Sequence, residues 1–142
     1  MAFGTAARQA IALLIFNGTT WAGWADNTAS SPITTISVSL HTADPTSGNQ
    51  TTSESAYTSY ARVSPARTSG GYSCTSGVAT NVAAVTFPAC TGGTSSLTHC
   101  ALGKASSGTG EVMTAGALTA GLSVSTGITP QFAISGLSCT IA

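Results

Sequence analysis

The spacing of apolar residues changes once along the chain. Over residues 4–16 apolar side chains recur at helical spacing, which predicts one N-terminal helix. Thr5 is the expected N-cap, and the Asn17-Gly18 pair is expected to end the helix. Three apolar residues of this helix are expected to face the body of the protein: Ile11, Leu14 and Ile15.

After Pro32 the pattern has period two. "ITTISVSL" places Ile36, Val38 and Leu40 on one face and polar residues on the other, which predicts a half-buried strand ending near His41. From residue 57 onward, short alternating segments follow one another, separated by turns rich in Gly and Ser. Strand-like segments at about 8–12-residue spacing are typical of antiparallel sandwiches. The predicted fold is therefore mainly β, an antiparallel β-sandwich or jelly-roll-like domain of about eight strands with one short N-terminal helix.

Individual β segments carry more specific expectations. "YTSYARVSPA" at 57–66 is predicted to be an edge or bulged strand because Pro65 interrupts it. In "AAVTFPAC", Val85 and Phe87 should point inward. "EVMTAGAL" and "LSVST" are expected as two separate strands.

The chain shows no internal repeat and no linker, and 142 residues suit one domain. We expect a single domain over 1–142, made of a helix at 1–18, a Trp-containing loop at 19–32 and a β-sandwich at 33–142.

Charged residues are scarce, with four Lys or Arg and four Asp or Glu, and this argues against partners that bind through many basic residues. Nucleic-acid binding needs clustered basic residues, and so does a polybasic membrane patch, so neither partner is expected. Hydroxyl groups supply the polarity instead, since the chain holds 20 Ser and 24 Thr. Such a surface suits a protein that is packed against other proteins.

No segment is long enough to cross a bilayer. The longest apolar run, "AIALLIF" at 10–16, has seven residues, whereas a spanning helix needs about 20. Residues 1–25 could also be read as a signal peptide, but one Arg and a short apolar core make a weak one, and a retained helix is favoured.

Two tryptophans lie in the loop "TTWAGWADNTASSP". Trp21 and Trp24 could stack on sugar rings, but we favour packing, either in a gap between helix and sheet or in an oligomer contact. Together with Ile11 and Leu14 they form an apolar set expected to lie at a contact with another subunit or with the shell of a larger assembly.

Residues arranged for chemistry are not evident. Cys74, Cys90, Cys100 and Cys139 lack zinc-ligand spacing, and whether they form disulfides is left open. No GxSxG or P-loop sequence is present, and none of the four acidic residues is marked as one of a catalytic pair. No enzyme activity, metal or cofactor is expected.

The stretch "LHTADP" contains the one His–Asp combination that could suggest catalysis. Pro45 ends a strand, and Asp44 before it can accept hydrogen bonds from the following turn. His41 can bond across the same turn. We therefore interpret His41, Asp44 and Pro45 as a structural turn.

Several segments, in order, resemble a family of small virion proteins of tailed bacteriophages. They are "SLHTADP", "YAR" at 60–62, "ATNVAAVTFPA" at 79–89, "LTH" at 97–99, "GAL" at 116–118 and "GITPQF" at 127–132. The long Trp-containing loop, the long loop after "LHTADP" and the cysteines depart from the family pattern.

The resemblance implies a non-enzymatic virion structural protein. The first expectation is a capsid decoration (cement) protein bound to the major capsid protein or other virion proteins. The alternative is a tail, collar or fibre-base component, and a carbohydrate-binding module ranks below both. A homo-oligomer is expected, with a trimer as the first guess.

Overall fold

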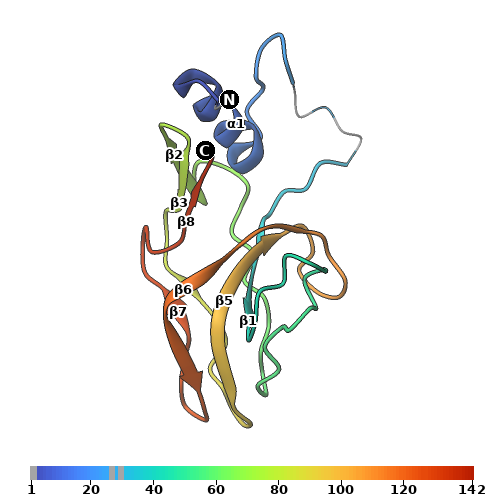
Figure 1. Ribbon diagram of the computed structural model, residues 1–142, viewed down its shortest axis with the longest axis vertical. Helices are drawn as coiled ribbons and strands as arrows, with labels where there is room; N and C mark the ends of the chain where they lie inside the picture. The colour runs from blue at the N-terminus through green and yellow to red at the C-terminus, as the bar shows by residue number, and fades with distance from the viewer. Residues whose placement is uncertain (1–2, 26–27, 29–30) are drawn as a thin grey trace. The chain divides into compact units, whose positions relative to one another are not determined.

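The chain is mainly β in the computed structural model, which describes residues 3–25, 28 and 31–142 (Figure 1). Its antiparallel sheets and one short N-terminal helix agree with the predicted class, and the arrangement is consistent with a sandwich. Contacts divide the chain into two compact units, which we call the helix unit and the sheet unit. The helix unit comprises Met1–Thr35, Pro65–Val85 and Phe132–Ala142, and the sheet unit comprises Ile36–Ser64 and Thr86–Gln131.

The helix unit is built around α1 (Thr5–Asn17). Gly4, not Thr5, is the N-cap, and no side chain caps this end, so the expected Thr5 cap is wrong. Gly18 ends the helix as predicted, since it adopts the left-handed conformation at φ 65° that glycine tolerates. Ala12 and Phe16 are the buried helix residues.

The three residues expected to face the body, Ile11, Leu14 and Ile15, are half-buried.

Arg67 closes the C-terminal end of α1 from a distant part of the sequence. Its Nε donates to the Ile15 carbonyl at 2.6 Å, and a terminal nitrogen donates to the Leu14 carbonyl at 2.6 Å. A cation at this end of a helix satisfies carbonyls that have no partner within the helix and complements the helix dipole.

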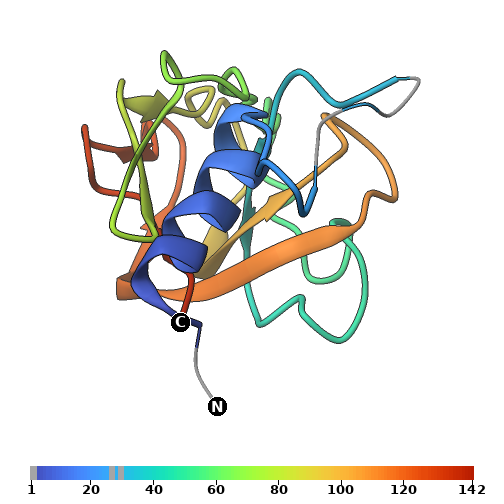
Figure 2. The ribbon, with the colours of Figure 1, turned by 90° about the horizontal axis from the view of Figure 1, so that it is seen from above.

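The helix unit also holds a three-stranded antiparallel sheet in the order β2-β3-β8. The strands are β2 (Tyr72–Thr75), β3 (Val78–Asn81) and β8 (Ser138–Thr140). Helix α1 lies beside β2 (Figure 1, Figure 2), and Gln9 joins them by donating to the Cys74 carbonyl at 3.0 Å. Phe16 and Tyr72 pack with ring centroids 5.2 Å apart, which fills the space between helix and sheet with aromatic side chains.

The sheet unit holds a second antiparallel sheet, ordered β1-β5-β6. Its strands are β1 (Ser37–His41), β5 (Ser95–Gly103) and β6 (Val112–Val124). Every residue of β1 is buried, so the predicted half-buried strand is wrong. The polar face is also covered, because Ser37 Oγ lies 2.8 Å from Ser64 Oγ and His41 Nδ1 lies 2.9 Å from the Thr52 carbonyl oxygen.

Two further segments differ from expectation. Residues 57–66 form isolated bridges in place of a regular strand, because Ser59 has a φ of 78°, which breaks the extended geometry. Residues 112–124 form one long strand where two were predicted, and neither Gly116 nor Gly121 within it has the positive φ of a turn glycine.

The remaining strands, β4 (Val85–Thr86) and β7 (Gln131–Phe132), pair with each other. Val85 and Phe87 are buried, as predicted. No disulfide joins the four cysteines. None of the helices in the described residues is long and apolar enough to span a membrane.

Candidate functional site

The sheet unit places a serine beside a histidine in its interior. Ser39 and His41 alternate along β1, so their side chains share one face of the strand, and Ser39 Oγ lies 2.8 Å from His41 Nε2. His41 Nδ1 lies 2.9 Å from the Thr52 carbonyl oxygen, which requires Nδ1 to carry the proton and donate. Burial lowers the pKa of His41 from its ordinary 6.5, so the ring is neutral and Nε2 accepts from the serine hydroxyl.

This arrangement has the connectivity of a serine nucleophile and its general base, but both side chains are fully buried. A substrate carbonyl has to reach the serine oxygen, and Ser39 has no exposed surface to offer. The bond from His41 to Thr52 instead fastens the backbone of the 42–55 loop to β1, and the bond with Ser39 holds the ring in place.

The predicted turn residues are brought into one loop, but His41 and Asp44 do not bond to each other. Asp44 Oδ1 accepts from the Thr46 backbone N–H at 2.9 Å, and this bond lowers the pKa of the exposed Asp44 carboxyl. Pro45 is buried, and its carbonyl accepts from the Gly48 N–H at 3.0 Å. His41 is occupied by Ser39 and Thr52, as described above.

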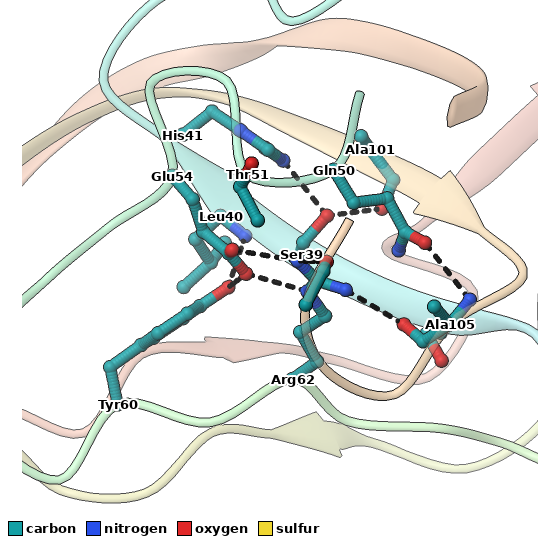
Figure 3. Close-up of polar contacts among 12 residues, drawn as sticks. Ser39, Leu40, His41, Gln50, Thr51, Glu54, Tyr60, Arg62, Ala101 and Ala105 are labelled. Atoms are coloured by element: carbon teal, nitrogen blue, oxygen red, sulfur yellow. Dashed lines mark hydrogen bonds and ion pairs between the residues drawn. The ribbon is translucent and has the colours of Figure 1, made fainter. Parts of the chain in front are cut away.

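An ion pair forms the centre of a larger polar cluster beside β1 (Figure 3). Arg62 Nε donates to Glu54 Oε1 at 2.6 Å, and Arg62 Nη2 donates to Oε2 at 2.7 Å. This two-bond contact is the strongest geometry that an Arg–carboxylate pair adopts. The side chain of Arg62 is 2% exposed and that of Glu54 is 16% exposed. The hydrogen bonds that Arg62 donates to Glu54 raise the pKa of Arg62, so the guanidinium stays charged.

Tyr60 connects this ion pair to β1. Its hydroxyl donates to Glu54 Oε1 at 3.0 Å and accepts the Leu40 backbone N–H at 3.0 Å. Burial raises the pKa of Tyr60 well above its usual range, so the hydroxyl remains protonated and able to donate. The Tyr60 hydroxyl therefore uses both its donor and an acceptor position.

The same cluster holds the 104–110 loop in place. Arg62 also donates to the carbonyls of Ala105 and Gly108, at 2.9 and 2.8 Å. The side chain of buried Gln50 accepts the Ala105 backbone N–H at 2.9 Å through Oε1. The backbone N–H of Gln50 donates to the Gly110 carbonyl at 2.8 Å. The loop is thus fixed through its backbone, by residues distant in sequence.

Sequence reasoning missed the role of Glu54, Arg62 and Gln50. Arg62 was noted as part of "YAR", but its partner was not. The available signal was the scarcity of charge, because in a chain with only eight charged residues each one is a candidate for a specific ion pair. Gln50 gave no signal, since nothing in a polar loop marks one side chain as buried.

A hollow of about 230 Å³ opens beside the ion pair, and Ser106 and Ser107 are also among the residues that line it. Its acidic group, Glu54, already accepts two bonds from Arg62 and one from Tyr60. Within the described residues, no three His, Cys, Asp or Glu side chains gather closely enough to hold a metal ion. The arrangement stabilises loops and offers no unengaged acid or base.

The two tryptophans lie in the helix unit at a tight turn. Trp21 and Ala25 exchange backbone hydrogen bonds of 2.7 and 2.9 Å, and Gly23 makes the turn with a φ of 78°. The indole rings of Trp21 and Trp24 are stacked, with centroids 5.5 Å apart. Trp24 is 79% exposed, so it does not fill a gap between helix and sheet.

Comparison with known proteins identifies the family to which this chain is similar. No curated protein matches the chain. A family model described as "Podophage GP4 fiber I protein gp80" matches residues 4–140, which is nearly the whole chain. The match agrees with the resemblance to tailed-phage virion proteins, without bearing on the "LHTADP" motif itself. The chain therefore belongs to this podophage fibre family and is a structural component of the virion, assembled in the host.

Proposed function

We propose that the protein is a non-enzymatic structural part of the fibre apparatus of a podophage. The observation that carries this proposal is the family match over residues 4–140, whose description names a fibre protein. That description favours the tail or fibre alternative over capsid decoration, which was the first expectation from the sequence. No feature of the described residues favours the outer shell in particular.

The chemistry of the interior supports a structural role. The Ser39–His41 pair is fully buried, and Glu54 already accepts hydrogen bonds from Arg62 and Tyr60. These groups hold the 42–55 and 104–110 loops, which suits a part whose surface loops must keep a fixed shape against a neighbour. The turn at Asp44 and Pro45 serves the same purpose.

The apolar set Ile11, Leu14, Trp21 and Trp24 is proposed as a contact with another virion protein or a second copy of the chain. Trp24 contributes most of the exposed surface. Burial of a large aromatic side chain contributes about 1.5–3 kcal/mol, and aromatic residues are enriched at the centres of interfaces. Two stacked rings also form a rigid surface that loses little side-chain entropy on binding.

The test uses phage that carry an amber codon in the gene for this chain. Grown without suppression, the phage should yield filled heads of normal thermal stability whose fibres are missing or incomplete. Complementation with Trp24→Ala should restore fewer fibres than wild-type protein does, while Thr126→Ala, an exposed turn residue, should restore them fully. Heads that lose stability while fibres remain intact would instead indicate capsid decoration.

A further inference from the structure

A buried histidine joins the 42–55 loop to β1. His41 Nδ1 donates to the Thr52 carbonyl at 2.9 Å, and His41 Nε2 accepts from Ser39 Oγ at 2.8 Å (Figure 3). The side chains of His41 and Ser39 are both fully buried. This arrangement requires a neutral imidazole whose single proton is on Nδ1. A second proton, on Nε2, would remove the acceptor that Ser39 uses and place a charge in the interior.

Charged and titratable side chains approach His41 from three directions. On β5, His99 is paired with His41 across the sheet, so both side chains lie on the same face. Within the loop, Glu54 forms a backbone bridge with His41. Beyond the loop, Arg62 and Tyr60 bind the Glu54 carboxylate. Strand β6, on the other side of β5, carries no charged residue.

The surroundings of His41 keep the ring neutral while the loop is closed. Burial of the ring is the largest influence on the pKa of His41, and it lowers that pKa from the ordinary 6.5. The Thr52 carbonyl and Glu54 act in the opposite direction, whereas Arg62 and His99 add to the decrease, and the net pKa is lowered. A loop that has left β1 exposes the ring to water, where it binds a proton at its ordinary pKa. Protonation therefore favours the open loop over the closed one.

Gln50 connects the same loop to the 104–110 loop. It lies two residues before Thr52, and its side chain is fully buried although it belongs to a loop. Its Oε1 accepts the Ala105 backbone N–H at 2.9 Å (Figure 3), and its backbone N–H donates to the Gly110 carbonyl at 2.8 Å. When Thr52 leaves β1, Gln50 leaves with it, and both of these bonds are lost.

We propose that the 42–55 loop is a pH-sensitive latch: in mild acid His41 takes up a second proton, the loop separates from β1, and the 104–110 loop loosens with it. The end of the loop at Glu54 stays attached, because its ion pair with Arg62 does not involve His41. The latch follows from the interior of the sheet unit and does not depend on where the protein sits in the virion. Its failure would therefore leave the fibre proposal unaffected.

Proton linkage sets the size of the effect. As long as the closed ring stays neutral, the open population rises by ~10-fold for each pH unit below the ordinary pKa of His41. With an open-state pKa of 6.5, the increase between pH 7.5 and pH 5.0 is at most ~30-fold. A histidine that reaches only part of this range gives a smaller increase in the same direction.

Amide hydrogen exchange of the full-length chain, followed by NMR at pH 7.5 and pH 5.0, provides the test. Rates are expressed as protection factors, which remove the intrinsic pH dependence of exchange. The N–H groups of Thr42, Gln50 and Ala105 all donate within the two loops, and in acid they should lose protection together, by ~3- to 30-fold. The Val38 N–H, which donates to the Val63 carbonyl at 2.7 Å, should stay more protected than these three at both pH values, which marks the opening as local.

The two histidines of the chain supply a matched pair of variants. His41→Gln keeps a donor and an acceptor on the side chain but does not titrate, so protection of the three loop amides should be the same at both pH values. His99→Gln removes the other histidine and leaves His41 in place. In that variant the loop amides should still lose protection in acid. Circular dichroism melts establish that each variant is folded.

Three results would overturn the proposal. One is wild-type protection at the loop amides that is equal at the two pH values, and another is protection equal to that of Val38, which would mean that the loops open only when the whole unit unfolds. The third is an acid response that persists in His41→Gln or disappears in His99→Gln. If His41→Gln does not fold, the ring resonances of His41 in the wild-type chain carry the test. They should titrate below pH 6.5, and titration at or above that value would overturn the proposal, because the closed loop would then accept the proton.

Discussion

Replacing Arg62 by methionine should destabilise the sheet unit more than any exposed charge substitution. The change removes the cation while Glu54 stays, at 16% side-chain exposure, and it also strips a donor from each of the Ala105 and Gly108 carbonyls. Removing one partner of a buried ion pair costs about 3–5 kcal/mol. Because Glu54 retains some contact with water, we expect the low end, about 3 kcal/mol.

The assay is urea unfolding followed by far-UV circular dichroism. With a urea dependence of about 2 kcal/mol per M, a loss of about 3 kcal/mol lowers the midpoint by about 1.5 M. Tryptophan fluorescence is unsuitable, since Trp21 and Trp24 both lie in the helix unit, whereas Arg62 lies in the sheet unit. Arg62→Lys keeps the charge but not the two-bond fork, so its loss should fall between that of Arg62→Met and wild type.

The matched control is Lys104→Met. Lys104 and Glu111 form the other ion pair of the described residues, at 3.2 Å, with side chains 59% and 72% exposed. An exposed pair contributes less than about 1 kcal/mol, so this variant should stay close to wild type. In a double-mutant cycle, Arg62→Met with Glu54→Gln should be less destabilised than the sum of the single changes. Equal, small losses for Arg62→Met and Lys104→Met would refute the reasoning.

Three other substitutions test separate contacts. Because the pKa of His41 is lowered in the native chain, the unfolded chain takes up a proton below pH 6.5 more readily than the native chain does. The free energy of unfolding should therefore fall as the pH drops below 6.5. His41→Gln should remove this pH dependence in a pH series of urea melts. Gly103→Ala should destabilise by about 1–3 kcal/mol because its new methyl group meets the Gln50 side chain, and Gln50→Ala in the same chain should recover part of the loss in urea melts. Arg67→Met should cost about 1–2 kcal/mol by leaving carbonyls at the end of α1 without their cation, and a helix signal in circular dichroism that melts unchanged would contradict this.

Patterns among neighbouring residues correctly predicted the structural features that depend on neighbouring residues alone. Helical spacing placed α1, Gly18 ended it, and alternation placed Val85 and Phe87 in the interior. The resemblance of ordered segments indicated a tailed-phage virion protein, in agreement with the family match. In each case the signal is a short stretch of neighbouring residues.

The errors come from contacts between residues distant in sequence. Burial of the polar face of β1 depends on Thr52 and Ser64, which contact it from outside the strand and which no alternation within β1 reveals. The loss of a regular strand at 57–66 depends on the positive φ of Ser59. The Glu54–Arg62 pair and the burial of Gln50 arise where three loops meet, so they appear only in the folded chain. Whether His41, Asp44 and Pro45 act purely as a structural turn stays a prediction, as does the single-domain organisation.

The location of this chain on the particle tests the central claim most directly. A short epitope tag after Ala142, labelled with gold on intact virions, reports that location by electron microscopy. The fibre proposal predicts gold confined to the fibres at the tail end of the particle, in a small and constant number per virion. Gold spread evenly over the head would contradict it and restore the capsid-decoration expectation.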